Sequence, residues 1–128
     1  MRDEINDIDN DNDNDLDTSS NPVNAWVAFL FDELHDPQVL EVTLKPSIRE
    51  ATVECLSLAG PGRQYSLPSR LVAGVLAKMK KLAQLDVAER SRMQCGRVRL
   101  LNFHGQPADF EVTTAPAAES ETMTLRRV

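Results

Sequence analysis

Two stretches of this chain place apolar residues at helical spacing, and short stretches of alternating polar and apolar residues follow each of them. A switch between a period of about 3.6 and a period of about 2 is the main sequence signal for helices and strands. The helical stretches run over residues 22–34 and 68–85. Each helix must bury one face, and a sheet offers a matching surface.

The first helix is expected to begin at Asn21-Pro22, because Asn is a favourable N-cap and Pro fits the first helical position. Asp36-Pro37 is expected to end it, since the residue before a proline disfavours helical geometry. Its apolar face, which we assign to the core, comprises Val23, Trp26, Val27, Leu30, Phe31 and Leu34.

Two strands are predicted between the helices, over residues 39–44 and 51–58. Gly60-Pro61-Gly62 is expected to be the turn that closes the second of them. In the first strand the alternating apolar residues are Leu40, Val42 and Leu44, and in the second strand one face carries Ala51, Val53, Cys55 and Ser57.

The second helix is predicted from about Pro68 to Leu85, and three strands follow it. Residues 97–103 and 108–114 should pair around His104-Gly105-Gln106, with Phe110 and Val112 facing the core. Residues 121–128 supply the last strand, with Met123 and Leu125 facing inward. The order predicts one α+β domain over residues 21–128, in which two main helices pack on a mostly antiparallel sheet.

Residues 1–20, MRDEINDIDNDNDNDLDTSS, form an acidic segment that is expected to be disordered, because it has few apolar side chains and its charges repel. A calcium loop is the alternative interpretation, since Asp9, Asp11 and Asp13 have the spacing of its first carboxylates. Asn14 and Ser20 do not fit that motif, which requires Gly and Glu at their positions.

The remaining charges exclude some classes of function. The net charge is -6, but residues 21–128 carry 13 basic and 12 acidic groups, so they offer no cationic excess for nucleic acid. Cys55, Cys95, His35 and His104 have no metal-ligand spacing, and no metal or cofactor is expected. No stretch is long and apolar enough for membrane insertion, so we expect a cytoplasmic protein with reduced thiols.

Several segments resemble the second N-terminal domain of the GspE/PilB family of type II secretion and type IV pilus assembly ATPases. In that family a helix ends in lysine-leucine-x-x-leucine-aspartate-isoleucine-alanine-glutamate, followed by a proline-glutamine-aspartate-glycine-arginine turn. This chain has LAQLDVAER at 82–90 and MQCGR at 93–97. Further matches in the same order are PVNAWVAFLFDELHD at 22–36, EVTLKP at 41–46, EVTTAP at 111–116 and SETMTLRRV at 120–128.

The resemblance implies a domain that folds over a nucleotide held by a C-terminal motor domain and points arginines at its phosphates, where negative charge develops in phosphoryl transfer. The chain departs from the family at those positions. Glu111 replaces one arginine, Cys55 and Ser57 align with two others, and Cys95 replaces the aspartate of the turn. The resemblance therefore implies that the nucleotide-facing arginines are lost.

An enzyme is not expected. The sequence holds no G-x-x-x-x-G-K-[ST] phosphate loop, and it ends at Val128, where the family continues into its catalytic domain. A stand-alone nucleophilic enzyme is a weak third reading, because neither His35 nor His104 can be paired with a nucleophile from the sequence.

The first hypothesis is thus a non-catalytic interaction module whose partner is a secretion or pilus ATPase or another protein of that machinery. The alternative is an accessory fragment that binds ATP or supplies Arg90, Arg92 or Arg126 in trans to a motor subunit. The residues predicted to contact the partner are Asp86, Glu89, Arg90, Arg92 and Arg97. A purely structural role is the competing interpretation: Asp86 and Glu89 anchor the loop to the helix end, and Arg97 pairs with Glu89 or Glu121 inside the fold.

Overall fold

The computed structural model describes residues 21–101, 105–118 and 120–128. The acidic segment 1–20 and His104 lie outside the described residues, so the predictions of a disordered tail and of the alternative calcium loop stay predictions. The elements follow one another as α1 (Pro22–Glu33), β1 (Val39–Lys45), β2 (Glu50–Ser57), β3 (Gly60–Pro68), α2 (Ser69–Leu82), β4 (Gln94–Leu101), β5 (Pro107–Pro116) and β6 (Glu121–Arg127).

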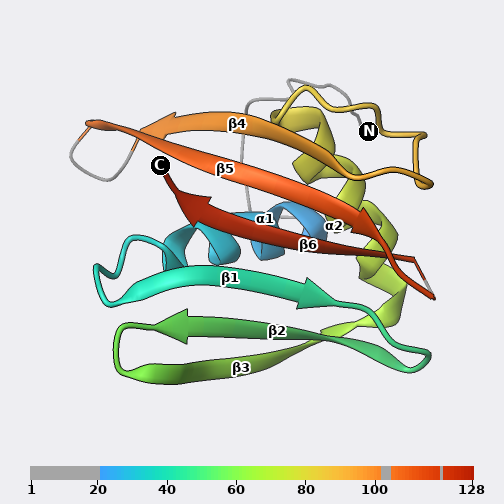
Figure 1. Ribbon diagram of the computed structural model, residues 1–128, viewed down its shortest axis with the longest axis horizontal. Coiled ribbons are helices and arrows are strands. Elements are labelled where there is room, and N and C mark those ends of the chain that lie inside the picture. Colours follow the sequence, from blue (N-terminus) through green and yellow to red (C-terminus); the bar gives the residue numbers. More distant parts are fainter. Residues whose placement is uncertain (1–20, 102–104, 119) are drawn as a thin grey trace.

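The strands form one sheet in the order β3-β2-β1-β6-β5-β4, and every recorded pairing is antiparallel. Both helices lie behind this sheet in Figure 1, so they cover one sheet face, and no described helix covers the other, which we call the open face. The predicted α+β class, with two helices packed on an antiparallel sheet, is confirmed.

Helix α1 begins as the sequence predicts. The side chain of Asn21 accepts hydrogen bonds from the backbone N–H groups of Val23 (2.9 Å) and Asn24 (3.3 Å), and Pro22 occupies the first turn. Its inner face contributes Val27, Leu30 and Phe31 to the core. Phe31 packs against Phe110 of β5 with ring centroids 5.0 Å apart, so α1 is joined to the second half of the sheet.

Helix α2 is shorter than predicted, because it ends at Leu82 rather than Leu85. Gln84 adopts a positive φ of 61°, a left-handed conformation that stops a helix and turns the chain. Lys80 and Lys81 occupy its last turn, where cations interact favourably with the helix dipole.

Strand β3 is absent from the sequence prediction, which treated Gly60-Pro61-Gly62 as a turn. The turn lies one step earlier, at Leu58-Ala59, and Gly60 takes a φ of 112° that favours glycine. Pro61 is tolerated because β3 is the edge strand, where a missing N–H breaks no inner ladder. Tyr65 of β3 packs edge-on against Phe29 of α1 at 4.8 Å.

Strand β1 departs from the predicted alternation at its start. A register shift between Val39 and Glu41 marks a bulge, so Val39 is buried while Leu40 is 39% exposed. Val42 and Leu44 face the core as predicted. Strand β5 runs through Ala115-Pro116, where the prediction had a break, because Pro116 pairs with Glu121 of β6 beyond the end of β4.

Strands β4, β5 and β6 otherwise follow the predicted pattern. Phe110, Val112, Met123 and Leu125 are all buried, as their alternation with polar residues indicates. They meet the inner side chains of α1 and α2, so a continuous core lies between the helices and the covered face of the sheet.

Candidate functional site

The loop that joins α2 to β4, residues 83–93, carries four of the five predicted contact residues: Asp86, Glu89, Arg90 and Arg92. The fifth, Arg97, is exposed on β4 and faces Glu111 of β5 across the open side of the sheet. The structure therefore brings four of these residues together on one loop and places Arg97 on a different surface.

The two acidic residues of the loop hold its backbone. The carboxylate of Asp86 accepts the N–H of Ala88 at 3.0 Å, and that of Glu89 accepts the N–H of Ser91 at 2.9 Å. Hydrogen bonds from Ser91 lower the pKa of Glu89, and Arg92 lies 3.5 Å from the same carboxylate. Both carboxylates thus bind backbone N–H groups within the loop itself, rather than at the helix end to which the structural interpretation assigned them.

Gln94, the first residue of β4, ties the loop to the sheet. Its side-chain oxygen accepts the N–H of Asp86 at 2.8 Å, and its amide nitrogen donates to the carbonyl of Asp86 at 2.9 Å. The exposed side chains of the loop include Arg90, Arg92, Val87 and Met93. Exposed apolar residues beside arginines are typical of a protein contact surface.

Beneath the loop lies a buried ion pair that sequence reasoning missed. Lys80 is 1% exposed, and its Nζ lies 2.8 Å from Oε1 of Glu121 and donates to the carbonyl of Glu89 at 2.6 Å. The prediction that Arg97 pairs with Glu89 or Glu121 is therefore wrong. Lys80 is the cation beside Glu121, Arg92 lies beside the Glu89 carboxylate, and Arg97 is exposed beside Glu111. The signal was available, since Lys80 follows Val72 and Leu76 at helical spacing on the apolar stripe.

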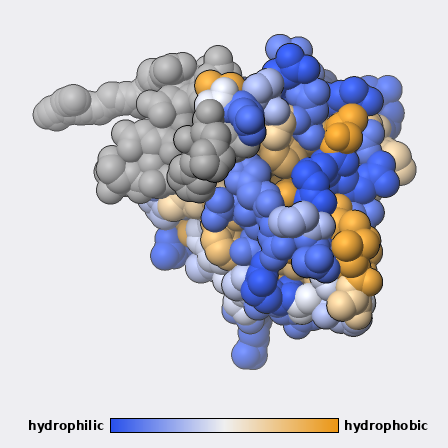
Figure 2. Space-filling model, turned by 90° about the vertical axis from the view of Figure 1, so that its left-hand side faces the viewer, coloured by the Kyte–Doolittle hydropathy of each residue, from blue (hydrophilic) through white to orange (hydrophobic). Residues whose placement is uncertain are grey.

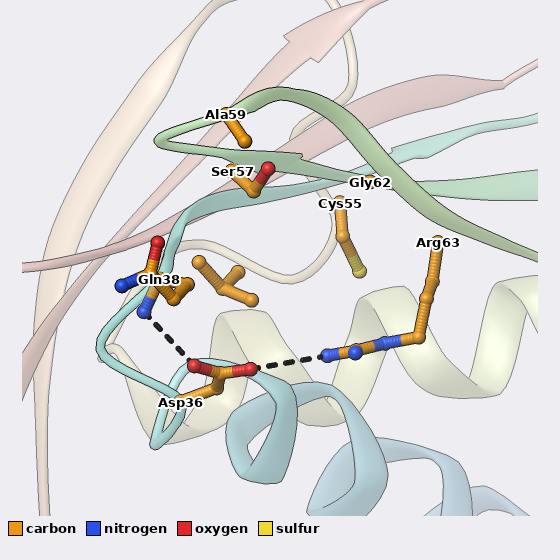
Figure 3. Close-up of a pocket in the computed structure, with 8 residues that line it drawn as sticks. Asp36, Gln38, Cys55, Ser57, Ala59, Gly62 and Arg63 are labelled. Atoms are coloured by element: carbon orange, nitrogen blue, oxygen red, sulfur yellow. Dashed lines mark hydrogen bonds and ion pairs between the residues drawn. The ribbon is translucent and has the colours of Figure 1, made fainter.

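A second polar site lies at the other end of the sheet, in a pocket of about 370 Å³. Figure 3 shows Arg63 of β3 reaching toward the end of α1, across the opening in which Cys55 lies. The pocket is lined by Asp36, Gln38, Val39, Cys55, Ser57, Ala59, Gly62 and Arg63.

Two carboxylates engage the arginine of this pocket. A terminal nitrogen of Arg63 lies 2.9 Å from Glu33 Oε1 and 3.6 Å from Asp36 Oδ2, and its Nε donates to Glu33 at 3.0 Å. Cys55 donates to the same Glu33 oxygen at 3.4 Å, and burial, together with this hydrogen bond, raises the pKa of the thiol to about 11. Sequence reasoning missed Arg63 because it missed β3.

The open face of the sheet carries a row of alternating charge. Register places Glu41 beside Arg126, Arg126 beside Glu111, and Glu111 beside Arg97. Arg126 donates to Glu111 and lowers the pKa of that carboxyl group. Each carboxylate of the row thus has a cationic neighbour on the next strand.

Hydrophobic groups are also exposed at the end of the sheet where β2 turns into β3. In the view of Figure 2, separate hydrophobic areas lie toward the right-hand side among mostly hydrophilic surface. Leu56 and Leu58, at the β2–β3 end of the sheet, are 45% and 63% exposed.

Among the described residues, no three His, Cys, Asp or Glu side chains are placed to hold a metal ion. No described helix is both long and apolar enough to cross a membrane.

Comparisons with known proteins match the expected resemblance in part. The chain is 38% identical over 61 residues to a type II secretion system protein E of Xanthomonas campestris pv. campestris, a match that covers 48% of this chain and 11% of that protein. It is 28% identical over 113 residues to the type II secretion system protein HxcR of Pseudomonas aeruginosa, covering 87% of this chain and 24% of the relative.

A third relative is the type IV pilus assembly ATPase TfpB of Acinetobacter baylyi, with 32% identity over 62 residues, 48% of this chain and 11% of that protein. No family model matches the chain. The chain thus matches less than a quarter of the length of each of these relatives. It is similar, over one segment of their length, to proteins of type II secretion and type IV pilus assembly.

Proposed function

We propose that this chain is a non-catalytic interaction module of type II secretion or type IV pilus machinery, acting in the cytoplasm on a secretion or pilus ATPase. The similarity to proteins of both systems supports the choice of machinery. Within those ATPases, our proposal assigns the chain to the second N-terminal domain, as the resemblance implies.

One observation supports the non-catalytic part of the proposal: at the positions that the resemblance aligns with phosphate-facing arginines, the side chains are neutral or anionic. Cys55 and Ser57 are neutral, and Arg63 beside them is engaged by Glu33 and Asp36. Glu111 is itself an anion, paired with Arg126. A triphosphate brought to either place would meet carboxylates, and its binding would require breaking these ion pairs.

The loop over residues 83–93 is the contact surface that we propose. Val87 is 41% exposed and Met93 is 68% exposed, and Arg90 and Arg92 lie between them in the sequence. The unbranched thioether of Met adapts to irregular surfaces, and arginine is enriched where partners meet.

Direct binding tests this proposal. The full chain is immobilised and the cognate secretion or pilus ATPase is passed over it, with and without the double substitution R90S/M93S. We expect saturable binding that the double variant weakens by about tenfold or more. The matched control is L56S/L58S, which removes two exposed leucines of the β2–β3 end. Equal binding by R90S/M93S and the parent chain would contradict the proposed surface.

A nucleotide role in trans is the second candidate, and one feature favours it. Arg90 makes no ion pair with any residue in the described part of the chain and is exposed, whereas Arg97 lies beside Glu111. Arg126 is a poorer donor for this purpose, because Glu111 and Glu41 flank it.

Fluorescent ATP separates the two candidates. The interaction module predicts no saturable ATP binding by the chain alone and no increase in ATP hydrolysis when it is added to the motor. The trans role predicts stimulated hydrolysis that R90Q abolishes. R63Q serves as the control, since Arg63 is already engaged by Glu33 and Asp36.

A further inference from the structure

The buried pair of Lys80 and Glu121 joins three parts of the fold at one point. Lys80 comes from the last turn of α2, Glu121 is the first residue of β6, and the carbonyl of Glu89 belongs to the loop. The Nζ of Lys80 lies 2.8 Å from Oε1 of Glu121 and 2.6 Å from the Glu89 oxygen. The side chains of Lys80 and Glu121 are 1% and 3% exposed.

Such a pair is a poor source of stability. Removing two charges from water is expensive, and their attraction offsets that cost only when the remaining polar atoms are satisfied. Here Oε2 of Glu121 has no hydrogen-bond partner among the described residues, and the same holds for the hydroxyl of Thr114. Thr114 lies on the same buried face of the neighbouring strand, two residues from the partner of Glu121.

The pair is well placed to fix the loop. The carbonyl of Glu89 accepts from Lys80 and, at 3.4 Å, from the amide of Gln94. Gln94 also holds both backbone groups of Asp86. The loop backbone is thus held by hydrogen bonds at Asp86 and Glu89. At Glu89 the donor is the buried ammonium group of Lys80, and a charged donor makes a stronger hydrogen bond than a neutral one.

The exposed side chains of the loop lie next to these ties in the sequence. Val87 lies between Asp86 and Glu89, while Arg90, Arg92 and Met93 follow between Glu89 and Gln94. Gly96 completes the arrangement from the sheet, because a Cβ at this position would lie 2.5 Å from the carbonyl of Ala83 at the start of the loop. Any movement of Glu89 would carry the arginines with it.

We propose that Lys80 and Glu121 are positioning residues, which set the conformation of the 83–93 loop for its partner rather than stabilising the fold as a whole. This inference rests on the proposed function in one respect, namely that the loop is the contact surface. The effect on the loop itself is independent of any partner. A pre-ordered loop loses less conformational entropy on binding, so the pair raises affinity without touching the partner.

The test replaces both charges by apolar groups in the full chain, as K80M/E121L, so that no buried charge is left alone. Amide hydrogen exchange is measured residue by residue, together with the thermal midpoint. We expect the amides of residues 86–93 to exchange at least about tenfold faster, while those of β1 and β2 keep their protection. The thermal midpoint should shift by no more than a few degrees, since apolar replacement of a buried pair is often neutral.

The matched control is K45M/E54L. Lys45 and Glu54 form a pair of nearly the same length, 2.9 Å, but their side chains are 55% and 37% exposed and lie on β1 and β2. This variant should leave loop exchange unchanged. Unchanged loop exchange in folded K80M/E121L would overturn the proposal, as would a uniform rise over the whole sheet.

If K80M/E121L does not fold, E121Q provides the same test with a smaller change. Its amide keeps the shape of the side chain but removes the charge that holds Lys80, so loop exchange should rise at least about threefold. A folded E121Q with parental loop exchange would overturn the proposal.

Binding to the cognate ATPase then separates the two levels of argument. Faster loop exchange with about tenfold weaker binding supports both the positioning role and the contact surface. Faster loop exchange with unchanged binding supports the positioning role and overturns the loop as the contact surface of the proposed function.

Discussion

The chain contains two halves with the same order of elements, each a helix followed by three antiparallel strands. The two halves differ in where they place an ion pair, at the surface in the first half and in the interior in the second. In the first half, residues 22–68, the main ion pair joins Arg63 and Glu33 at the rim of an open pocket, where the side chain of Arg63 is 53% exposed. In the second half, residues 69–127, the corresponding pair of Lys80 and Glu121 is buried under a loop.

The difference shows how depth changes what an ion pair does. A pair open to water is screened and contributes little to stability, whereas a buried pair constrains whatever its remaining hydrogen bonds reach. Arg63 closes one pocket, while Lys80 connects a helix, a strand and a loop. The second half is therefore where we expect substitutions of polar residues to change structure most.

The largest effect is expected from K80M alone. It would leave the carboxylate of Glu121 buried without its cation, which typically costs about 3–5 kcal/mol of unfolding free energy. Urea denaturation measures this loss. The counterpart in the first half is R63M, which should lower the unfolding free energy less, because the Glu33 carboxylate that it leaves is 12% exposed and still accepts from Cys55. Equal losses for the two variants would remove the contrast between the halves.

A glycine in the edge strand of each half provides the next comparison. In G96A the new Cβ would lie 2.5 Å from the carbonyl of Ala83 and 2.9 Å from Leu85, so backbone must move. We expect a loss of about 2–3 kcal/mol. In G62A the closest atom is the carbonyl of Cys55 at 2.9 Å, and the free edge of β3 can shift, so the loss should be smaller. A larger loss for G62A in urea denaturation would contradict this ranking.

Each half also carries one free cysteine, Cys55 buried and Cys95 exposed. Iodoacetamide at pH 8 should modify Cys95 at least about tenfold faster, because the thiolate is the nucleophile and burial raises the pKa of Cys55. Peptide mass spectrometry follows both rates. Similar rates would show that the first half opens readily.

The same thiol predicts a pH dependence. Because the pKa of Cys55 is raised from 9.0 to about 11, the folded state holds this proton more tightly than the unfolded state. Its contribution to stability is complete below pH 9 and is lost between about pH 9 and 11. C55A should lack this part of the decline in urea denaturation across that interval.

The smallest effect concerns the starts of the two helices. N21A removes the side chain that caps α1 and should lower the unfolding free energy by about 1 kcal/mol. Helix α2 begins after Pro68 without a side-chain cap, so S69A should change stability little. An equal loss of unfolding free energy in S69A and N21A would contradict the expected effect of the Asn21 cap.

The predictability of the fold followed the strength of local signals. Helix α1 was predictable at its start because the Asn21-Pro22 pair combines two capping preferences. Strand β3 was not, because Gly60-Pro61-Gly62 is typical of a turn and only its place at the sheet edge makes a strand possible there. The bulge at Leu40 was equally hidden, since register depends on the neighbouring strands.

The candidate site was predictable in the same uneven way. The loop residues Asp86, Glu89, Arg90 and Arg92 are close in sequence, so their grouping needed no tertiary information. Arg97 was grouped with them by sequence distance, but the alternation of β4 turns it to the open face. Arg63 could not be assigned to the pocket without β3.

The sequence by itself determined the α+β class, the helix positions and most inward-facing side chains, because the periods of about 3.6 and about 2 are local properties of the chain. Only the tertiary structure decided which charges meet. Lys80 and Glu121 are far apart in the sequence of the second half, and Glu33 and Arg63 come from a helix and a strand. Helical spacing alone indicates that Lys80 is buried, but which charges pair depends on distances in space that the spacing of residues along the chain does not give.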